Sequence, residues 1–355
     1  MRSLRAVPSA GSVPSAPSLP SVLAGAGAAL VLAVAAAVPA AADDHDGFTI
    51  EDPRIVESSG LAASRAHPGV YWTHNDQDKG AFLYAVDSRT GKTVATVTMT
   101  GVGAPRDVEA ISVGGDGNIY VGDIGDNLNG TWSNVWVYKL PEPKTLKDQT
   151  VRATQYVVKY ADGARDAEAL MVHPKTGRVY IVSKNEDGGG LYEGPERMSA
   201  SGTNVFRRIS EVDLWVTDGA FSPDGEQLAL RGYFGGIWYA WQGAGQKPQR
   251  KGRLSVPLQR QGESVTYTPD GTTLMYGTEG EQSEVKPVEA PGGGSGDGSG
   301  GSSGGAGSGD GGGSGDSGVE GGFRTGAIVV GAVLLAVFGW RRLGRRGGPA
   351  ARRRR

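Results

Sequence analysis

Residues 107–127 read DVEAISVGGDGNIYVGDIGDN, and this stretch decides the fold. It contains an acidic pair, a short apolar strand, an Asp-Gly turn, a second strand and a further acidic group. Similar stretches begin at Glu57, Asp166, Thr217 and Gly262. Five copies of a two-strand unit predict a β-propeller, in which each repeat forms one blade around a common centre.

The intervals between the copies agree with this fold. The acidic residues Glu57, Glu109, Glu168, Asp218 and Glu263 are separated by 52, 59, 50 and 45 residues. A four-stranded blade typically takes about 40–50 residues. We therefore expect an all-β propeller of five four-stranded blades. Six blades remain the alternative if one set of outer strands is irregular.

The strands of each blade follow from the alternation of apolar and polar residues. Residues 57–102, 107–163, 166–213 and 217–259 predict four blades, and a fifth begins at 262. Residues 151–160 are expected to form one outer strand of blade two, after an insertion at 141–150. The last copy has only three strands by Ala290, so residues 48–55 are expected to close the ring as an N-terminal strand.

Two segments resemble the strand repeats of known propellers. FSPDGEQLAL at 221–230 and YTPDGTTLMY at 267–276 are similar to repeats of TolB-like, WD40-like and NHL-like propellers. The resemblance implies the architecture. It does not imply a function, because propellers of this kind serve as enzymes, scaffolds and ligand-binding proteins.

Both ends of the chain differ from the repeats. Residues 1–42 combine two arginines, an apolar run and a small-residue exit, which is typical of a secretory signal, with an uncleaved anchor as the alternative. Residues 291–322 are almost wholly Gly, Ser and Asp and predict a flexible linker. Residues 323–340 are apolar and long enough to cross a bilayer as a helix.

Topology follows from the arginine-rich tail at 341–355. Arginines beside a membrane span place that flank in the cytoplasm. The propeller at 43–290 is therefore expected outside the cell, anchored to the plasma membrane through residues 323–340. This organisation resembles that of surface proteins of Gram-positive, high-GC bacteria. The absence of cysteine agrees with export without disulfide bonds.

The predicted extracellular segment is acidic. Residues 43–290 contain 25 Lys and Arg against 34 Asp and Glu, a net charge of −9. Such a surface repels nucleic acid and favours cations or basic partners. We expect an extracellular protein, peptide or glycan as the partner, and no nucleic acid.

Strand geometry predicts which polar and charged side chains lie together at one end of the ring. The innermost strand of a blade begins at the end of the ring where the second strand finishes, because the chain reverses once between them. The residues expected at this end are Glu57, His74, Asn75, Asp76, Asp107, Glu109, Asp123, Asp126, Asn127, Asp166, Glu168, Lys184, Asn185, Glu186, Asp218, Arg231, Glu263 and Glu279.

Crowded carboxylates suit a hard cation such as Ca²⁺ or Mg²⁺. The candidate metal ligands are Glu109, Asp123, Asp126, Glu168, Asp218 and Glu263. The candidate ligand-binding residues are Glu57, His74, Asn75, Asp76, Lys184, Asn185 and Arg231. The other hypothesis is structural: each acid accepts hydrogen bonds from backbone N–H groups of the next blade and ties the blades together. Both roles can coexist.

Two functions remain open. The first is a non-enzymatic cell-surface module that binds a protein, peptide or glycan. The second is a divalent-metal-dependent hydrolase, because the chain resembles calcium-dependent phosphotriesterase and gluconolactonase propellers. That resemblance implies metal-site roles for Glu57, Asn75, Asn127, Asn185 and Asp218, although this chain is richer in Glu. Nothing resembles a nucleophilic triad, and there is no cysteine or G-x-S-x-G motif, so binding is favoured.

Overall fold

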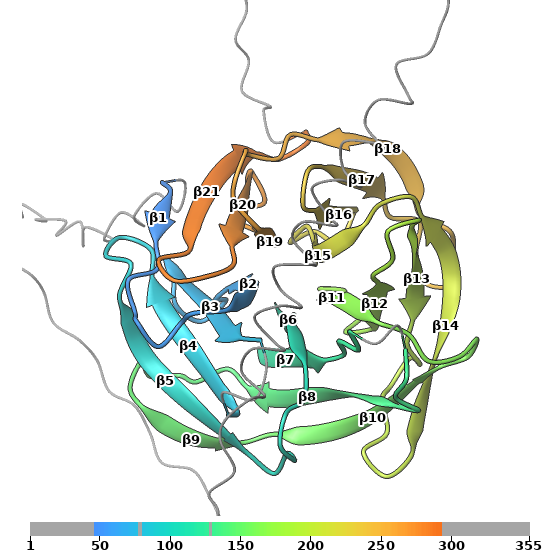
Figure 1. Ribbon diagram of the computed structural model, residues 1–355, viewed down its shortest axis with the longest axis horizontal. Coiled ribbons are helices and arrows are strands. Elements are labelled where there is room, and N and C mark those ends of the chain that lie inside the picture. The colour runs from blue at the N-terminus through green and yellow to red at the C-terminus, as the bar shows by residue number, and fades with distance from the viewer. Residues whose placement is uncertain (1–45, 77–79, 128–129, 293–355) are drawn as a thin grey trace, which may run out of the picture. The chain divides into compact units, whose positions relative to one another are not determined.

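The computed structural model describes residues 46–76, 80–127 and 130–292, which form 21 β-strands (Figure 1). The described residues include no helix that could cross a membrane. The predicted signal at 1–42, nearly all of the linker at 291–322, the span at 323–340 and the tail at 341–355 lie outside the described residues. The assignments of these four segments stay predictions.

The strands form five four-stranded blades around one centre, so the predicted propeller is confirmed. The innermost strands β2, β6, β11, β15 and β19 neighbour one another in a closed ring. Blade one is β2 (Ser58–Ala63), β3 (Val70–Asn75), β4 (Phe82–Asp87) and β5 (Thr93–Thr100). Blade two is β6 (Val108–Val113), β7 (Asn118–Asp123), β8 (Val135–Pro141) and β10 (Thr154–Tyr160).

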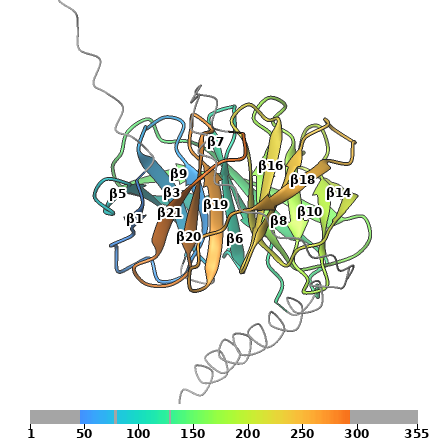
Figure 2. The same ribbon diagram turned by 90° about the horizontal axis from the view of Figure 1, so that it is seen from above.

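The remaining blades repeat this meander. Blade three is β11 (Ala167–Val172), β12 (Val179–Ser183), β13 (Gly189–Glu193) and β14 (Thr203–Val212). Blade four is β15 (Val216–Phe221), β16 (Gln227–Gly232), β17 (Gly236–Ala240) and β18 (Gln249–Leu254). Blade five is β19 (Gly262–Tyr267), β20 (Thr273–Thr278), β21 (Glu284–Glu289) and the N-terminal β1 (Phe48–Thr49). In Figure 2, β6 and β19 run from one end of the ring to the other.

The N-terminal strand closes the ring, as the sequence predicts. Phe48 pairs with Val285 of β21, and the N–H of Ile50 donates to the Ser283 carbonyl at 2.9 Å. The pairing is shorter than the expected 48–55, because after Ile50 the chain leaves blade five and the N–H of Glu51 donates to the Gly91 carbonyl of blade one. Phe48 and Val285 also belong to the apolar cluster between blades five and one. Closure therefore rests on packing as well as on the strand pair.

The outer strands correct one expectation. Residues 151–160 are not a single strand, because the buried Ala153 interrupts them. The segment before it, β9 (Gln149–Arg152), pairs in parallel with β5 of blade one, while β10 pairs with β8 and, in parallel, with β14 of blade three. The insertion at 141–150 makes this possible, since it carries the chain back to blade one. Blades one to three are thus joined at their outer edges.

A β-bulge near the start of every innermost strand is the feature that positions the site. The register against the second strand shifts at equivalent places in all five blades. A bulge leaves an extra residue outside the ladder and re-aims its side chain. The residues skipped by the pairing are Ser59 with Gly60, Glu109, Glu168, Thr217 and Glu263.

The bulges also correct the alignment of the repeats. The structural equivalents of Glu109 are Ser59 and Thr217, not Glu57 and Asp218. We call this end of the ring, where the innermost strands begin, the acid end. The other end, the turn end, holds the first hairpin of each blade. There Gly69, Gly117, Gly177, Gly225 and Gly271 all have φ between 68° and 76°, which favours glycine.

Candidate functional site

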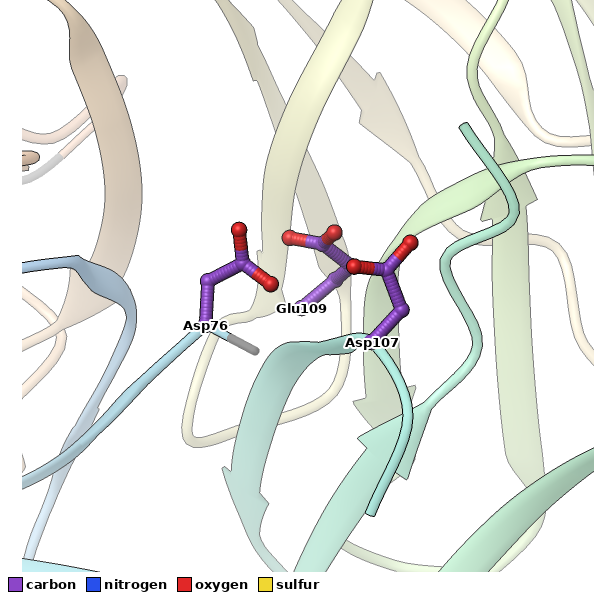
Figure 3. A group of neighbouring side chains, drawn as sticks. All are labelled: Asp76, Asp107 and Glu109. Carbon is purple, nitrogen blue, oxygen red and sulfur yellow. The ribbon is translucent and has the colours of Figure 1, made fainter. Parts of the chain in front are cut away.

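Three carboxylates from blades one and two converge at the acid end (Figure 3). Asp76 follows β3, Asp107 precedes β6, and Glu109 is the bulged residue of β6. One oxygen from each lies within 4.8 Å of the other two. A Ca²⁺ ion holds oxygens at roughly 2.3–2.6 Å, so opposite ligands lie roughly 4.6–5.2 Å apart. One ion could therefore contact all three carboxylates.

Backbone and amide contacts hold two of these acids in place. The N–H of Asp76 donates to the Glu57 carbonyl at 2.8 Å. The N–H of Asp107 donates to a carboxylate oxygen of Asp123 at 3.0 Å, and Asn127 Nδ2 donates to Asp107 Oδ2 at 2.8 Å. The site is thus pre-organised by the ends of β3 and β7.

Glu109 is linked to the neighbouring blade. Ser59 Oγ, from the equivalent bulge of blade one, donates to Glu109 Oε2 at 3.0 Å. Burial, followed by the charges of Asp76 and Glu168, raises the pKa of Glu109 well above its usual value. Burial and the adjacent Asp107 raise the pKa of Asp76 in the same way. These acids repel one another when ionised, and a cation would relieve that repulsion.

A second acidic group lies on blades three to five. Lys184 Nζ pairs with Glu168 Oε1 at 2.7 Å; the Glu168 carboxylate is buried, and the Lys184 side chain is partly buried. Burial raises the pKa of Glu168 to about 8 despite this partner. Burial lowers the pKa of Lys184, but the charge of the Glu168 carboxylate and other negative groups outweighs this, so that the pKa of Lys184 is raised well above its usual value. The Lys184 ammonium also lies 5.4 Å from the centre of the Tyr233 ring.

Glu263 differs from the other bulged acids. It is only 6% exposed, yet within the described part of the chain no hydrogen bond or ion pair reaches its carboxylate. Burial raises its pKa well above the usual value; Lys184 opposes this shift and Glu168 adds to it. A buried carboxylate that lacks a hydrogen bond or ion pair costs free energy, which a cationic ligand would recover.

Three candidate metal ligands serve the backbone instead. Asp123 accepts from two backbone N–H groups and from the hydroxyl of Tyr138. Asp126 accepts from Thr131 Oγ1 and from a backbone N–H in the same loop. Asp218 accepts from the N–H of Val265 in the next blade at 2.9 Å. Of these three acids only Asp218 accepts from the next blade, as the structural hypothesis states, whereas Asp123 and Asp126 accept within blade two. A metal-ligand role for Glu109, Glu168 and Glu263 stays a prediction.

Two of the ligand-binding candidates hydrogen-bond to backbone groups of the protein. Asn75 accepts from the N–H groups of Val56 and Glu57 and donates to the Arg54 carbonyl. Asn185 is exposed and accepts within its own turn from the N–H of Asp187. Neither amide points to a shared ligand position with the acids above.

Arg231 is fully buried between blades four and five. It donates to the carbonyls of Ser264 and Gly277 at 2.7 and 2.9 Å. Its guanidinium occupies space that only a glycine leaves open, because a Cβ on Gly262 would lie 1.6 Å from Arg231 Nη2. Arg231 therefore ties blade five to blade four.

His74 is buried and poorly placed for proton transfer. Burial lowers its pKa to about 4, so the ring is neutral at physiological pH. Its Nε2 faces Gly60, where an added Cβ would lie 2.7 Å away. Glu57, which precedes β2, has one buried carboxylate oxygen without a hydrogen-bond partner among the described residues.

Sequence reasoning missed Ser59, Thr217 and Tyr233. The first two lack a carboxylate and so escaped a search for acids, although they occupy the same bulge as Glu109. A usable signal was the small residue that follows the bulged position, as in Glu109-Ala110 and Ser59-Gly60. Tyr233 lies in the hairpin between β16 and β17, and nothing in the sequence marks that position.

The turn end contains a cavity of about 230 Å³. Its walls are mostly apolar or hydroxyl-bearing side chains from the ends of the innermost strands. The hydroxyls of Ser112 and Thr266 accept from the N–H groups of Val172 and Ala63 in adjacent blades. The lining includes Ala62, Ser64, Ile111, Val113, Phe221 and Thr268.

Comparisons with known proteins leave the function open. No protein-family model matches the chain, and no curated protein matches it. A structure of the mitotic checkpoint complex is 12% identical in sequence, with a TM-score of 0.36. The match covers 65% of this chain and 60% of the other chain. A structure described as a putative 6-phosphogluconolactonase from Bacteroides uniformis is 13% identical, with a TM-score of 0.37. That match covers 66% of this chain and 67% of the other chain.

Kuenenia stuttgartiensis hydrazine synthase shares 13% identity at a TM-score of 0.36, with 62% of this chain and 61% of that chain covered. The chain thus spans about 60% of the length of two of these three structures. The propeller assignment rests on the strand pairing of the chain itself.

Proposed function

We propose that the chain is a non-enzymatic binding module of the cell surface, anchored through residues 323–340, and that its acid end binds a divalent cation, Ca²⁺ in the first instance. The observation that carries the cation site is the approach of Asp76, Asp107 and Glu109 oxygens to within 4.8 Å of one another. The mutual repulsion of these acids supports it, because burial and neighbouring negative charges raise the pKa values of Asp76 and Glu109 well above their usual range.

The chemistry of the donors suits this ligand. Carboxylate oxygens are hard ligands, which Ca²⁺ and Mg²⁺ prefer, and the flexible coordination of Ca²⁺ tolerates an irregular set better than the octahedron of Mg²⁺. Because burial and neighbouring charges raise the pKa values of Asp76 and Glu109, a cation competes with protons for these carboxylates, and its affinity should increase with pH.

The hydrolase alternative receives no comparable support. The residues that it would require are Glu57, Asn75, Asn127, Asn185 and Asp218. The amide of Asn75 and the carboxylate of Asp218 are used by backbone groups, and Asn185 bonds within its own turn. His74, the histidine at this end, is neutral and faces Gly60. We therefore propose binding without catalysis.

Thermal unfolding of the full-length chain in detergent tests the cation site. We expect the wild-type midpoint to rise with Ca²⁺ and to fall again with chelator, because a ligand at 100 times its Kd stabilises by about 2.7 kcal/mol. Glu109→Gln keeps the shape of the side chain and should remove this response. Glu226→Gln, at the exposed turn end, is the matched control and should keep it. A wild-type midpoint indifferent to both Ca²⁺ and Mg²⁺ would show that the acid end binds neither ion.

A further inference from the structure

Exposed apolar side chains gather around the acid end. Five large apolar side chains are exposed among the described residues, and Phe82, Phe234 and Leu258 are three of them. Phe82 begins β4, Phe234 lies between β16 and β17, and Leu258 lies between β18 and β19. All three positions belong to the end of the ring where the innermost strands begin. Leu258 is 95% exposed, which is unusual for a leucine.

An aromatic group connects this apolar rim with the acidic centre. The rings of Trp215 and Tyr233 meet edge to face at 5.1 Å, and the rings of Tyr233 and Phe234 lie 6.3 Å apart. Burial and the charge of Glu263 raise the pKa of the Tyr233 hydroxyl well above its usual value. The Tyr233 ring therefore connects exposed Phe234 with the Lys184 ammonium, which lies 5.4 Å from the centre of the ring and pairs with Glu168.

The acidic centre has more negative than positive groups. Glu263 interacts electrostatically with Glu168 and Glu279 as well as with Lys184 and Arg231. The charged groups that act on one another here include Asp76, Asp107, Glu109, Asp166, Glu168, Asp218, Glu263 and Glu279 against Lys184 and Arg231. A divalent cation at Asp76, Asp107 and Glu109 would leave Glu263, in the adjacent blade five, without a hydrogen bond or ion pair from the described residues.

We propose that the acid end docks a basic and partly apolar segment of a partner protein. A Lys or Arg side chain of the partner pairs with Glu263 beside the Tyr233 ring, and apolar neighbours in the same segment contact Phe234 and Leu258. Charge complementarity selects this occupant, because the predicted extracellular segment carries a net charge of −9 and its centre is acidic. An aromatic side chain beside a carboxylate is also a favourable setting for an organic cation.

This proposal rests on the acid end being a ligand site, but it uses different residues from the cation site. Glu263 and Tyr233 belong to blades five and four, whereas Asp76, Asp107 and Glu109 belong to blades one and two. The two sites can therefore be tested separately. Glu109→Gln addresses the cation, and Glu263→Gln addresses the basic side chain.

Fluorescence anisotropy with a labelled nonapeptide of Lys, Leu and Phe tests the proposal on the full-length chain. The control peptide has Glu at each Lys position. We expect Glu263→Gln to weaken binding of the basic peptide at least tenfold, and Leu258→Ser to weaken it several-fold. Glu226→Gln, which removes an exposed charge at the turn end, should change it less than twofold.

Several results would overturn the proposal. It fails if the acidic peptide binds as tightly as the basic one, if the wild type binds neither, or if Glu263→Gln and Glu226→Gln weaken binding equally. Leu258→Ser keeps the test decisive should Glu263→Gln fold poorly, because a 95% exposed side chain contributes little to folding. Basic-peptide binding without any Ca²⁺ effect would disprove the cation site and keep this proposal. A Ca²⁺ effect without peptide binding would do the reverse.

Discussion

The two ends of the propeller are built from the same five innermost strands, yet their chemistry is opposite. At the turn end three polar side chains are satisfied by neighbouring blades: Ser112 and Thr266 each accept from a backbone N–H, and Glu142 accepts from three donors. At the acid end the bulges turn Glu109, Glu168 and Glu263 out of the strand ladder, and one of them has no partner among the described residues.

This difference shows how a repeated fold separates stability from binding. A buried polar group that is fully paired ties blades together, whereas crowded carboxylates cost stability until a ligand neutralises them. The bulge is the local device that makes the difference, because it re-aims one side chain per blade without changing the sheet. The predictions below test this contrast in order of expected effect.

The largest effect is expected at Glu142, at the turn end. Its carboxylate accepts from Trp72 Nε1, Ser64 Oγ and the N–H of Ala66 at 2.9, 2.6 and 3.2 Å. Glu142→Ala leaves three donors without their acceptor between blades one and two, which should cost about 3–5 kcal/mol. Denaturant unfolding measures this loss. A loss below about 1 kcal/mol would show that the turn end does not depend on such pairing.

The next effect is a pH dependence at the acid end. The folded-state pKa of Glu168, about 8, lies above the ordinary value of 4.5, so the folded protein holds the proton more tightly than the unfolded chain. Its contribution to stability is therefore largest near pH 4.5 and is lost as the pH rises to about 8. The slope for one such group is at most about 1.4 kcal/mol per pH unit.

Unfolding of wild type and Glu168→Gln across this pH range, both in chelator, measures that slope. We expect the wild type to lose stability faster than the variant as the pH rises. Parallel curves would mean that Glu168 does not hold a proton in the folded state. Added Ca²⁺ should flatten the wild-type curve if the cation lowers the repulsion around this acid.

The smallest effect is expected at Gly117 in the first hairpin of blade two. Its φ is 71°, and an added Cβ would meet no atom within 4 Å. Gly117→Ala should therefore cost only the backbone strain, about 1 kcal/mol. Gly60→Ala at the acid end is the comparison and should cost more than Gly117→Ala. Its Cβ would lie 2.7 Å from His74 Nε2 and 2.9 Å from the backbone nitrogen of Ile111. Equal midpoint shifts in the two variants would contradict this reading of their surroundings.

Much of the architecture was predictable because its signals are local. Strand alternation and the Asp-Gly turns lie within single repeats, and the shortage of one strand after Ala290 pointed to closure by the N-terminal segment. The convergence of acids at one end followed from strand direction alone. Periodicity could not show that Ala153 divides residues 149–160 between two blades. The reason is that β9 pairs with β5, which lies about 50 residues earlier in the chain.

By itself, then, the sequence determined the repeat and which residues lie at the acid end, while the strand pairing decided for five blades over six. Only the tertiary structure decided which acids are free to bind. Asp123, Asp218 and Glu263 look alike in sequence, but Asp123 accepts from the backbone N–H of Asp107 and Asp218 from that of Val265, whereas no backbone N–H among the described residues donates to Glu263. The physical reason is that a carboxylate's role depends on which donors it meets, and that depends on register, bulges and the packing of one blade against the next.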